Sequence, residues 1–97
     1  LEVYVGEEQH LPKAMSLGSA GAISGMANLW PELIYQAYSE REETRISSVL
    51  SQLKEKKDIF KDFPFIPTAK VIMYLLSGKE SWLYCRPPFV PLKRNQI

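Results

Sequence analysis

The sequence contains one cysteine, Cys85, and one histidine, His10, among its 97 residues. A lone cysteine gives no disulfide framework and no cysteine-based metal site. His10 has no serine or cysteine at a spacing that indicates a catalytic pair. We therefore expect no metal and no cofactor. The cysteine usage fits a reducing compartment, so we expect a cytoplasmic location.

Strong charge of either sign is also absent. The chain has 12 basic and 11 acidic residues, and its net charge of +1 provides no basic surface for nucleic acid or an anionic membrane. The longest apolar run, residues 71–76, is far shorter than the roughly 20 residues of a membrane-spanning helix. No secretory signal is visible, and because the first residue is leucine we do not expect a natural N-terminus there. Residues 18–21 lack the Gly-Lys-Ser/Thr ending of a phosphate loop.

Two short stretches of strand-forming residues are present. Residues 1–5 are rich in β-formers and end at Gly6, which predicts a strand. Residues 21–27 are small and apolar, have no helical period and lie between turn signals, which is typical of a buried parallel strand. Between the two, we predict a short helix with Pro12 near its start and Gly18 as its cap.

Three further helices follow. Pro31 marks the start of the first, the second covers residues 42–60, and the third covers residues 67–76 and stops at Gly78. Residues 86–91 contain three prolines and predict an extended, packed tail. The apolar positions expected to face inward are Leu33, Ile34, Ala37 and Tyr38, then Ile46, Val49, Leu50, Leu53 and Phe60, and finally Ala69, Ile72, Met73 and Leu76.

The predicted order is strand, helix, strand, three helices and tail, so the fold class is α/β. A helix connects the strands, which makes them parallel. Parallel sheets have several strands and both faces covered, and two strands alone would leave their edges unpaired. The sequence therefore predicts a piece of a larger α/β structure.

Several blocks of residues, taken in order, resemble the C-terminal part of the dihydrodipicolinate synthase / N-acetylneuraminate lyase family. The blocks are residues 3–8, residues 21–28, Pro31, residues 66–67 with Lys70, and residues 86–92. The resemblance covers essentially the whole chain and implies the C-terminal portion of a (β/α)₈ barrel, with strands seven and eight and the helices that follow. Residues 1–41 would be the last two βα units, and residues 42–97 the C-terminal helical extension and proline-rich tail.

The resemblance implies the chemistry of a class I aldolase or lyase, in which a lysine forms a Schiff base with pyruvate or another 2-oxo acid. It places that lysine, a tyrosine that handles the proton and a turn that holds the carboxylate upstream of Leu1. We therefore expect no catalytic residue in this chain. The residues agree, because every lysine lies outside both predicted strands and barrel active sites lie at the C-terminal ends of strands.

For this segment the resemblance implies a substrate-binding pocket wall made of Gly6, Glu8, Ile23 and Gly25. Gly6 follows strand seven, and the backbone carbonyl of Ile23 approaches the 2-oxo acid. Glu8 and Gly25 align with positions that hold hydroxyls of a sugar-like substrate, where the lyase branch has aspartate and serine. Plainer alternatives are a turn glycine with positive φ at Gly6 and a helix-start charge at Glu8. We expect Ser24 to be a packing residue.

The branch of the family is indicated by residues 63–70, FPFIPTAK. Synthases usually have Asn-Pro-Ile-Pro-x-Lys there, so this chain lacks the asparagine and has its lysine one position later. Together with the RPPFVP tail, this resembles 2-keto-3-deoxy-sugar-acid aldolases. Dihydrodipicolinate synthase proper and a non-catalytic, self-associating barrel fragment remain alternatives. The expected partners are a 2-oxo acid, the rest of the barrel and further copies in a homo-oligomer.

Overall fold

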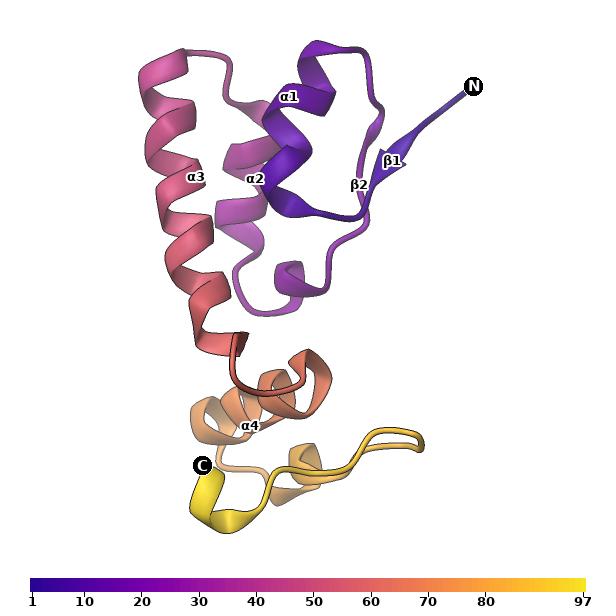
Figure 1. Cartoon of the computed structure of the whole chain (residues 1–97), viewed down its shortest axis with the longest axis vertical. Coiled ribbons are helices and arrows are strands. Elements are labelled where there is room, and N and C mark those ends of the chain that lie inside the picture. Colours follow the sequence, from indigo (N-terminus) through magenta and orange to yellow (C-terminus); the bar gives the residue numbers. More distant parts are fainter. The chain divides into compact units, whose positions relative to one another are not determined.

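The computed structural model describes residues 1–97, apart from the side chain of Arg94. It is mostly helical, with a small two-stranded sheet (Figure 1). The chain divides into two compact units, Leu1–Lys57 and Asp58–Ile97, here called unit 1 and unit 2. The predicted division after residue 41 stays a prediction.

Unit 1 contains two strands, two short 3₁₀ helices and three α-helices. In chain order these are β1 (Tyr4–Val5), η1 (Glu8–His10), α1 (Leu11–Ser16), β2 (Gly21–Ala22), η2 (Gly25–Asn28), α2 (Pro31–Ser39) and α3 (Glu43–Lys57). Unit 2 contains η3 (Asp58–Phe60), α4 (Phe65–Ser77), η4 (Glu80–Leu83) and η5 (Arg94–Gln96).

The two strands are parallel, as the sequence predicts. Tyr4 lies opposite Gly21 and Val5 lies opposite Ala22. Both strands are shorter than the predicted residues 1–5 and 21–27, so those bounds are wrong. Each strand has a single neighbour, and a ladder continues only where a neighbour supplies hydrogen bonds.

Hydrogen bonds on either side of this short ladder hold the strands together. The amide of Ala20 donates to the carbonyl of Val3 at 2.8 Å, and the amide of Ile23 donates to the carbonyl of Val5 at 3.0 Å. The hydroxyl of Ser19 also donates to the carbonyl of Val3, at 2.7 Å. The start and the end of the strand pair are therefore both fixed.

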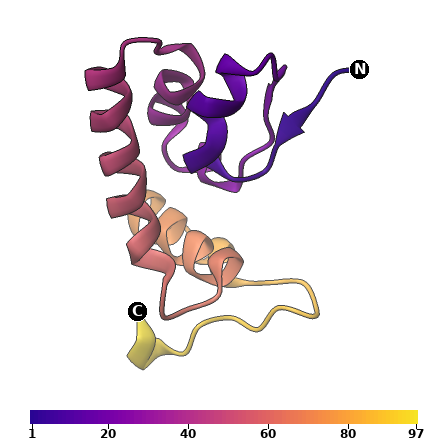
Figure 2. The same ribbon diagram turned by 45° about the horizontal axis from the view of Figure 1, so that its top comes forward.

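Within unit 1, α1 and α2 lie between the strands and α3 (Figures 1 and 2). A proline stands in the first turn of each, Pro12 in α1 and Pro31 in α2, where its missing N–H costs nothing. The predicted inward face of α2 is confirmed at Leu33 and Ala37, which are buried, and is wrong at Tyr38, which is 40% exposed. The helices thus connect the strands to α3 through a shared apolar core.

α3 confirms the predicted long helix and its apolar side. Val49 and Leu53 are buried, and η3 continues the segment to the buried Phe60. Basic residues gather in the last turn of α3 and Glu43 lies in the first, which suits the helix dipole. The amphipathic period alone was enough to place this helix.

α4 of unit 2 ends at Gly78, which has φ of 73° in the left-handed region and caps the helix as predicted. Its inward face is not the predicted one, because Pro67, Thr68 and Val71 are buried while Leu76 is 75% exposed. The helix is apolar nearly all round, so its sequence pattern does not select a face.

The tail beyond η4 is neither extended throughout nor packed, so the prediction for residues 86–91 is wrong. Residues 87–88 form a turn in which the amide of Phe89 donates to the carbonyl of Arg86 at 3.1 Å. Phe89 and Val90 are exposed, and prolines leave few donors with which to attach it. One anchor is the Lys70 ammonium, which donates to the carbonyl of Tyr84 at 2.5 Å. Among the described residues, no helix is long and apolar enough to cross a membrane.

Candidate functional site

The carboxyl ends of β1 and β2 meet at one edge of the strand pair, because the strands are parallel. Gly6 and Glu8 follow β1, and Ile23, Ser24 and Gly25 follow β2. In open and closed parallel sheets, the carboxyl ends of strands are where ligands bind. We therefore take these strand ends as the candidate site.

A side-chain hydrogen bond joins the two strand ends. The Ser24 hydroxyl donates to Oε1 of Glu8. Glu8 is only 7% exposed, and η1, which carries it, packs against α2 and α3. Burial of a carboxylate is costly unless it is hydrogen-bonded, so the serine stabilises Glu8 in this position.

Each residue predicted for the pocket wall lies at this edge, and their binding roles stay predictions. Gly6 and Gly25 are exposed, and the side chain of Ile23 is 78% exposed. Gly6 does not have a positive φ, and the space beside it is open, so the alternative of a positive-φ turn glycine is wrong. Gly25 begins η2 and does not continue a strand.

Ser24 is the residue that the sequence analysis missed, because it was expected only to pack. Its hydroxyl makes a specific bond across 16 positions of the chain. The predicted parallel pairing was a partial signal, because parallel strands bring together the residues that follow them. The register itself could not be read from the sequence.

A second carboxylate beside the site has a different environment. Glu7 forms an ion pair with Lys57 at the end of α3. The hydrogen bond and the charge of Lys57 lower the pKa of Glu7 below its usual value of 4.5. Both side chains are partly open to water, with 58% of Glu7 and 42% of Lys57 exposed. Glu7 is therefore a solvated charge, unlike the buried Glu8.

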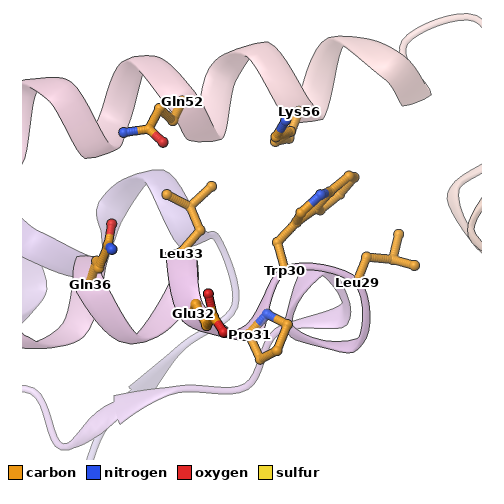
Figure 3. A pocket seen from close by; sticks show the side chains of 8 residues that line it. All are labelled: Leu29, Trp30, Pro31, Glu32, Leu33, Gln36, Gln52 and Lys56. Atoms are coloured by element: carbon orange, nitrogen blue, oxygen red, sulfur yellow. The ribbon is translucent and has the colours of Figure 1, made fainter.

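A separate hollow of about 410 Å³ lies between the start of α2 and α3 (Figure 3). Trp30 points toward Lys56, whose ammonium lies 5.8 Å from the centre of the indole ring. This distance is near the outer limit of a cation–π contact. The lining residues are Leu29, Trp30, Pro31, Glu32, Leu33, Gln36, Gln52 and Lys56. They include none of the strand-end residues.

The lysines lie outside the strands, as expected. Most are on α1, α3 and α4, and the others are in turns or the tail. Within the part of the chain that the structure describes, no group of three or more histidine, cysteine, aspartate or glutamate side chains could hold a metal ion.

Comparison with known proteins adds to this geometry. The model of the dihydrodipicolinate synthetase family matches residues 1–97. A probable 2-dehydro-3-deoxy-D-pentonate aldolase of Escherichia coli, YjhH, is 33% identical over 92 residues, which is 91% of this chain and 30% of the relative. The chain thus spans about a third of that relative's length. No solved structure matches. The chain belongs to the dihydrodipicolinate synthetase family.

Proposed function

We propose that the chain is the C-terminal part of a class I aldolase that cleaves a 2-keto-3-deoxy sugar acid to pyruvate and an aldehyde. The observation that carries the proposal is the similarity over 91% of the chain to a relative named as a 2-dehydro-3-deoxy-D-pentonate aldolase. The family match over residues 1–97 supports the same class of chemistry. The substrate class also agrees with the sequence features at residues 63–70.

The proposed reaction breaks the bond between the third and fourth carbons of the substrate. The hydroxyl on the fourth carbon loses its proton and becomes the aldehyde, while the third carbon takes the electron pair and then a proton. A five-carbon acid of this kind would give pyruvate and glycolaldehyde. In a class I enzyme, a lysine Schiff base with the keto group accepts the electrons.

In this proposal β1 and β2 are strands seven and eight of a (β/α)₈ barrel. The parallel pairing supports it, and so does the lack of any further strand among the described residues. Gly6, Glu8, Ile23 and Gly25 form a pocket wall at the carboxyl ends of these strands. The wall binds and orients the 2-oxo acid, and the catalytic lysine lies in another part of the protein.

Trapping of the Schiff base tests the proposal. The full-length protein is incubated with pyruvate and borohydride, digested and analysed by mass spectrometry, and pyruvate without borohydride serves as the control. We expect a reduced pyruvyl adduct on one lysine outside residues 1–97. An adduct on any lysine of this chain, such as Lys70, would contradict the assignment. Condensation of pyruvate with aspartate semialdehyde would favour the synthase alternative.

The open edges of the two-stranded sheet favour a second candidate, a non-catalytic module that associates with copies of itself. Light scattering on the 97-residue chain, followed by mass analysis under denaturing conditions, distinguishes the two. A stable assembly of 11.1 kDa chains alone would support the module. Recovery only together with a larger partner polypeptide would support the aldolase.

A further inference from the structure

The bond between Ser24 and Glu8 joins a deeply buried group to a more accessible one. Glu8 is 7% exposed, whereas Ser24 is half-buried and is flanked in the chain by the exposed Ile23 and Gly25. A ligand at the strand ends can therefore reach the serine hydroxyl more easily than the carboxylate behind it.

The direction of this hydrogen bond determines what the serine can offer. An ionised carboxylate only accepts hydrogen bonds, so the Ser24 proton is committed to Glu8. The lone pairs of Oγ then remain for a ligand, and a hydroxyl that already donates to a charged acceptor becomes a better acceptor itself. Ser24 thus presents an acceptor, with a negative charge behind it.

An acceptor backed by a carboxylate discriminates between ligand groups. It favours a hydroxyl, which can donate a hydrogen bond, and it disfavours a carboxylate or phosphate, which would bring two acceptors and two negative charges together. In the part of the chain that the structure describes, no other hydrogen bond reaches the Glu8 carboxylate, so nothing competes with Ser24 for its position.

We propose that Ser24 is a specificity-determining residue whose Oγ accepts a hydrogen bond from a hydroxyl of the aldehyde half of the substrate, and that Glu8 is a positioning residue that fixes this Oγ. This inference rests on the proposed aldolase function. It refines the pocket wall by assigning the direct contact to Ser24 and an indirect role to Glu8. It also defines the part of the substrate that faces Ser24 and Glu8 as hydroxylated and uncharged.

The test compares two aldehydes that differ by one hydroxyl. The full-length enzyme is assayed for condensation of pyruvate with glycolaldehyde or with acetaldehyde. For Ser24→Ala we expect kcat/KM to fall about tenfold with glycolaldehyde, the loss of one hydrogen bond, and to be unchanged with acetaldehyde. Ser24→Thr keeps the hydroxyl and should keep the preference. Glu8→Gln should lose part of it.

Controls separate this role from a structural one. Ser47→Ala, which changes an exposed serine of α3, should alter neither rate. Equal losses with both aldehydes in Ser24→Ala and Glu8→Gln would indicate a structural role and overturn the inference. Trapping with pyruvate and borohydride distinguishes the two proposals. No adduct in the wild type overturns both, whereas a normal adduct with an unchanged aldehyde preference in Ser24→Ala overturns the role of Ser24 alone.

Discussion

Unit 1 and unit 2 differ in how their apolar side chains are used. In unit 1 the core residues come from every α-helix, and a long-range side-chain bond between Lys57 and Glu7 joins distant parts of the sequence. Its exposed large apolar residues include Val3, Tyr4 and Ile23 in and beside the strands and two tyrosines on α2. Many of the apolar side chains that unit 1 leaves open therefore lie in and beside the two strands.

Unit 2 leaves its apolar residues open in a different pattern. On α4, Ile66, Leu75 and Leu76 are exposed, and the exposed apolar residues continue through η4 and the tail to Val90. Its aromatic pair, Phe60 and Phe65, is local, with ring centres 4.6 Å apart and ring planes tilted by 42°. The comparison teaches that unit 1 stabilises itself through its own core, while the described side-chain hydrogen bonds of unit 2 span at most the 14 positions between Lys70 and Tyr84.

The largest expected effect tests the core of unit 1. Leu53→Ala removes a side chain that is 1% exposed and should lower the free energy of unfolding by about 2–5 kcal/mol. Leu76→Ala makes the same change at an exposed site of unit 2 and should cost less than about 0.5 kcal/mol. Urea denaturation followed by circular dichroism measures both. Equal losses of unfolding free energy in the two variants would contradict the difference in core packing between unit 1 and unit 2.

A smaller effect compares the buried polar groups of the two units. Ser24→Ala leaves Glu8 buried without its donor and should cost about 1–3 kcal/mol. Thr68→Val removes a bond from Thr68 Oγ1 to the carbonyl of Pro64, 2.7 Å long, and should cost about 0.5–1.5 kcal/mol. Chemical denaturation again provides the measurement. A larger loss for Thr68→Val would reverse the ranking.

Replacing the glycine at a helix end by alanine should destabilise unit 1 and unit 2 by similar amounts. Gly18 after α1 has φ of 92° and Gly78 after α4 has φ of 73°, and an alanine is strained in this region. Each change to alanine should cost about 1 kcal/mol. Gly6→Ala is the matched control, because Gly6 has open space and no positive φ, and it should cost clearly less. Thermal unfolding would measure the change in melting temperature of each of the three variants.

The smallest effect concerns the pH dependence contributed by unit 1. Because Lys57 lowers the folded-state pKa of Glu7, the pair stabilises the fold above the unfolded value of 4.5, and this stability is lost as pH falls through the folded pKa. Both groups are partly exposed, so the loss should be only a few tenths of a kcal/mol. Denaturant titrations near neutral pH and near pH 3 should show it in the wild type and not in Glu7→Gln. The same loss in both proteins would assign it to other groups.

The sequence was sufficient to predict the helices that have apolar residues on one face and polar residues on the other. α2 and α3 have apolar residues at helical spacing against a polar face, and Leu33, Val49 and Leu53 are buried as predicted. α4 was located but its face was not, because Leu76 and Val71 lie on different sides of a helix that is apolar nearly all round. The buried face of a helix can be predicted only where an apolar face lies opposite a polar one, and overall hydrophobicity does not identify it.

The candidate site was predictable only in part. The family resemblance singled out Gly6, Glu8, Ile23 and Gly25, whereas the strand pattern placed Ile23 and Gly25 inside a strand of residues 21–27. The observed β2 ends at Ala22, because strand length depends on neighbours that no pattern specifies. The bond from Ser24 to Glu8 follows from the register of the pair and from the turn into η2. Neither is a property of local sequence.

The short span of the strand pair has a consequence for the order of folding. The residues joined by the Ser24 to Glu8 bond are 16 positions apart, and only the short helices η1 and α1 lie between the two strands. The entropy lost in closing so short a loop is small, and contacts of low sequence separation form early. We therefore expect β1, α1 and β2 to form before α3 packs against them. During synthesis, the chain would then carry the paired strands, with their unpaired outer edges, while the rest of unit 1 is still unfolded.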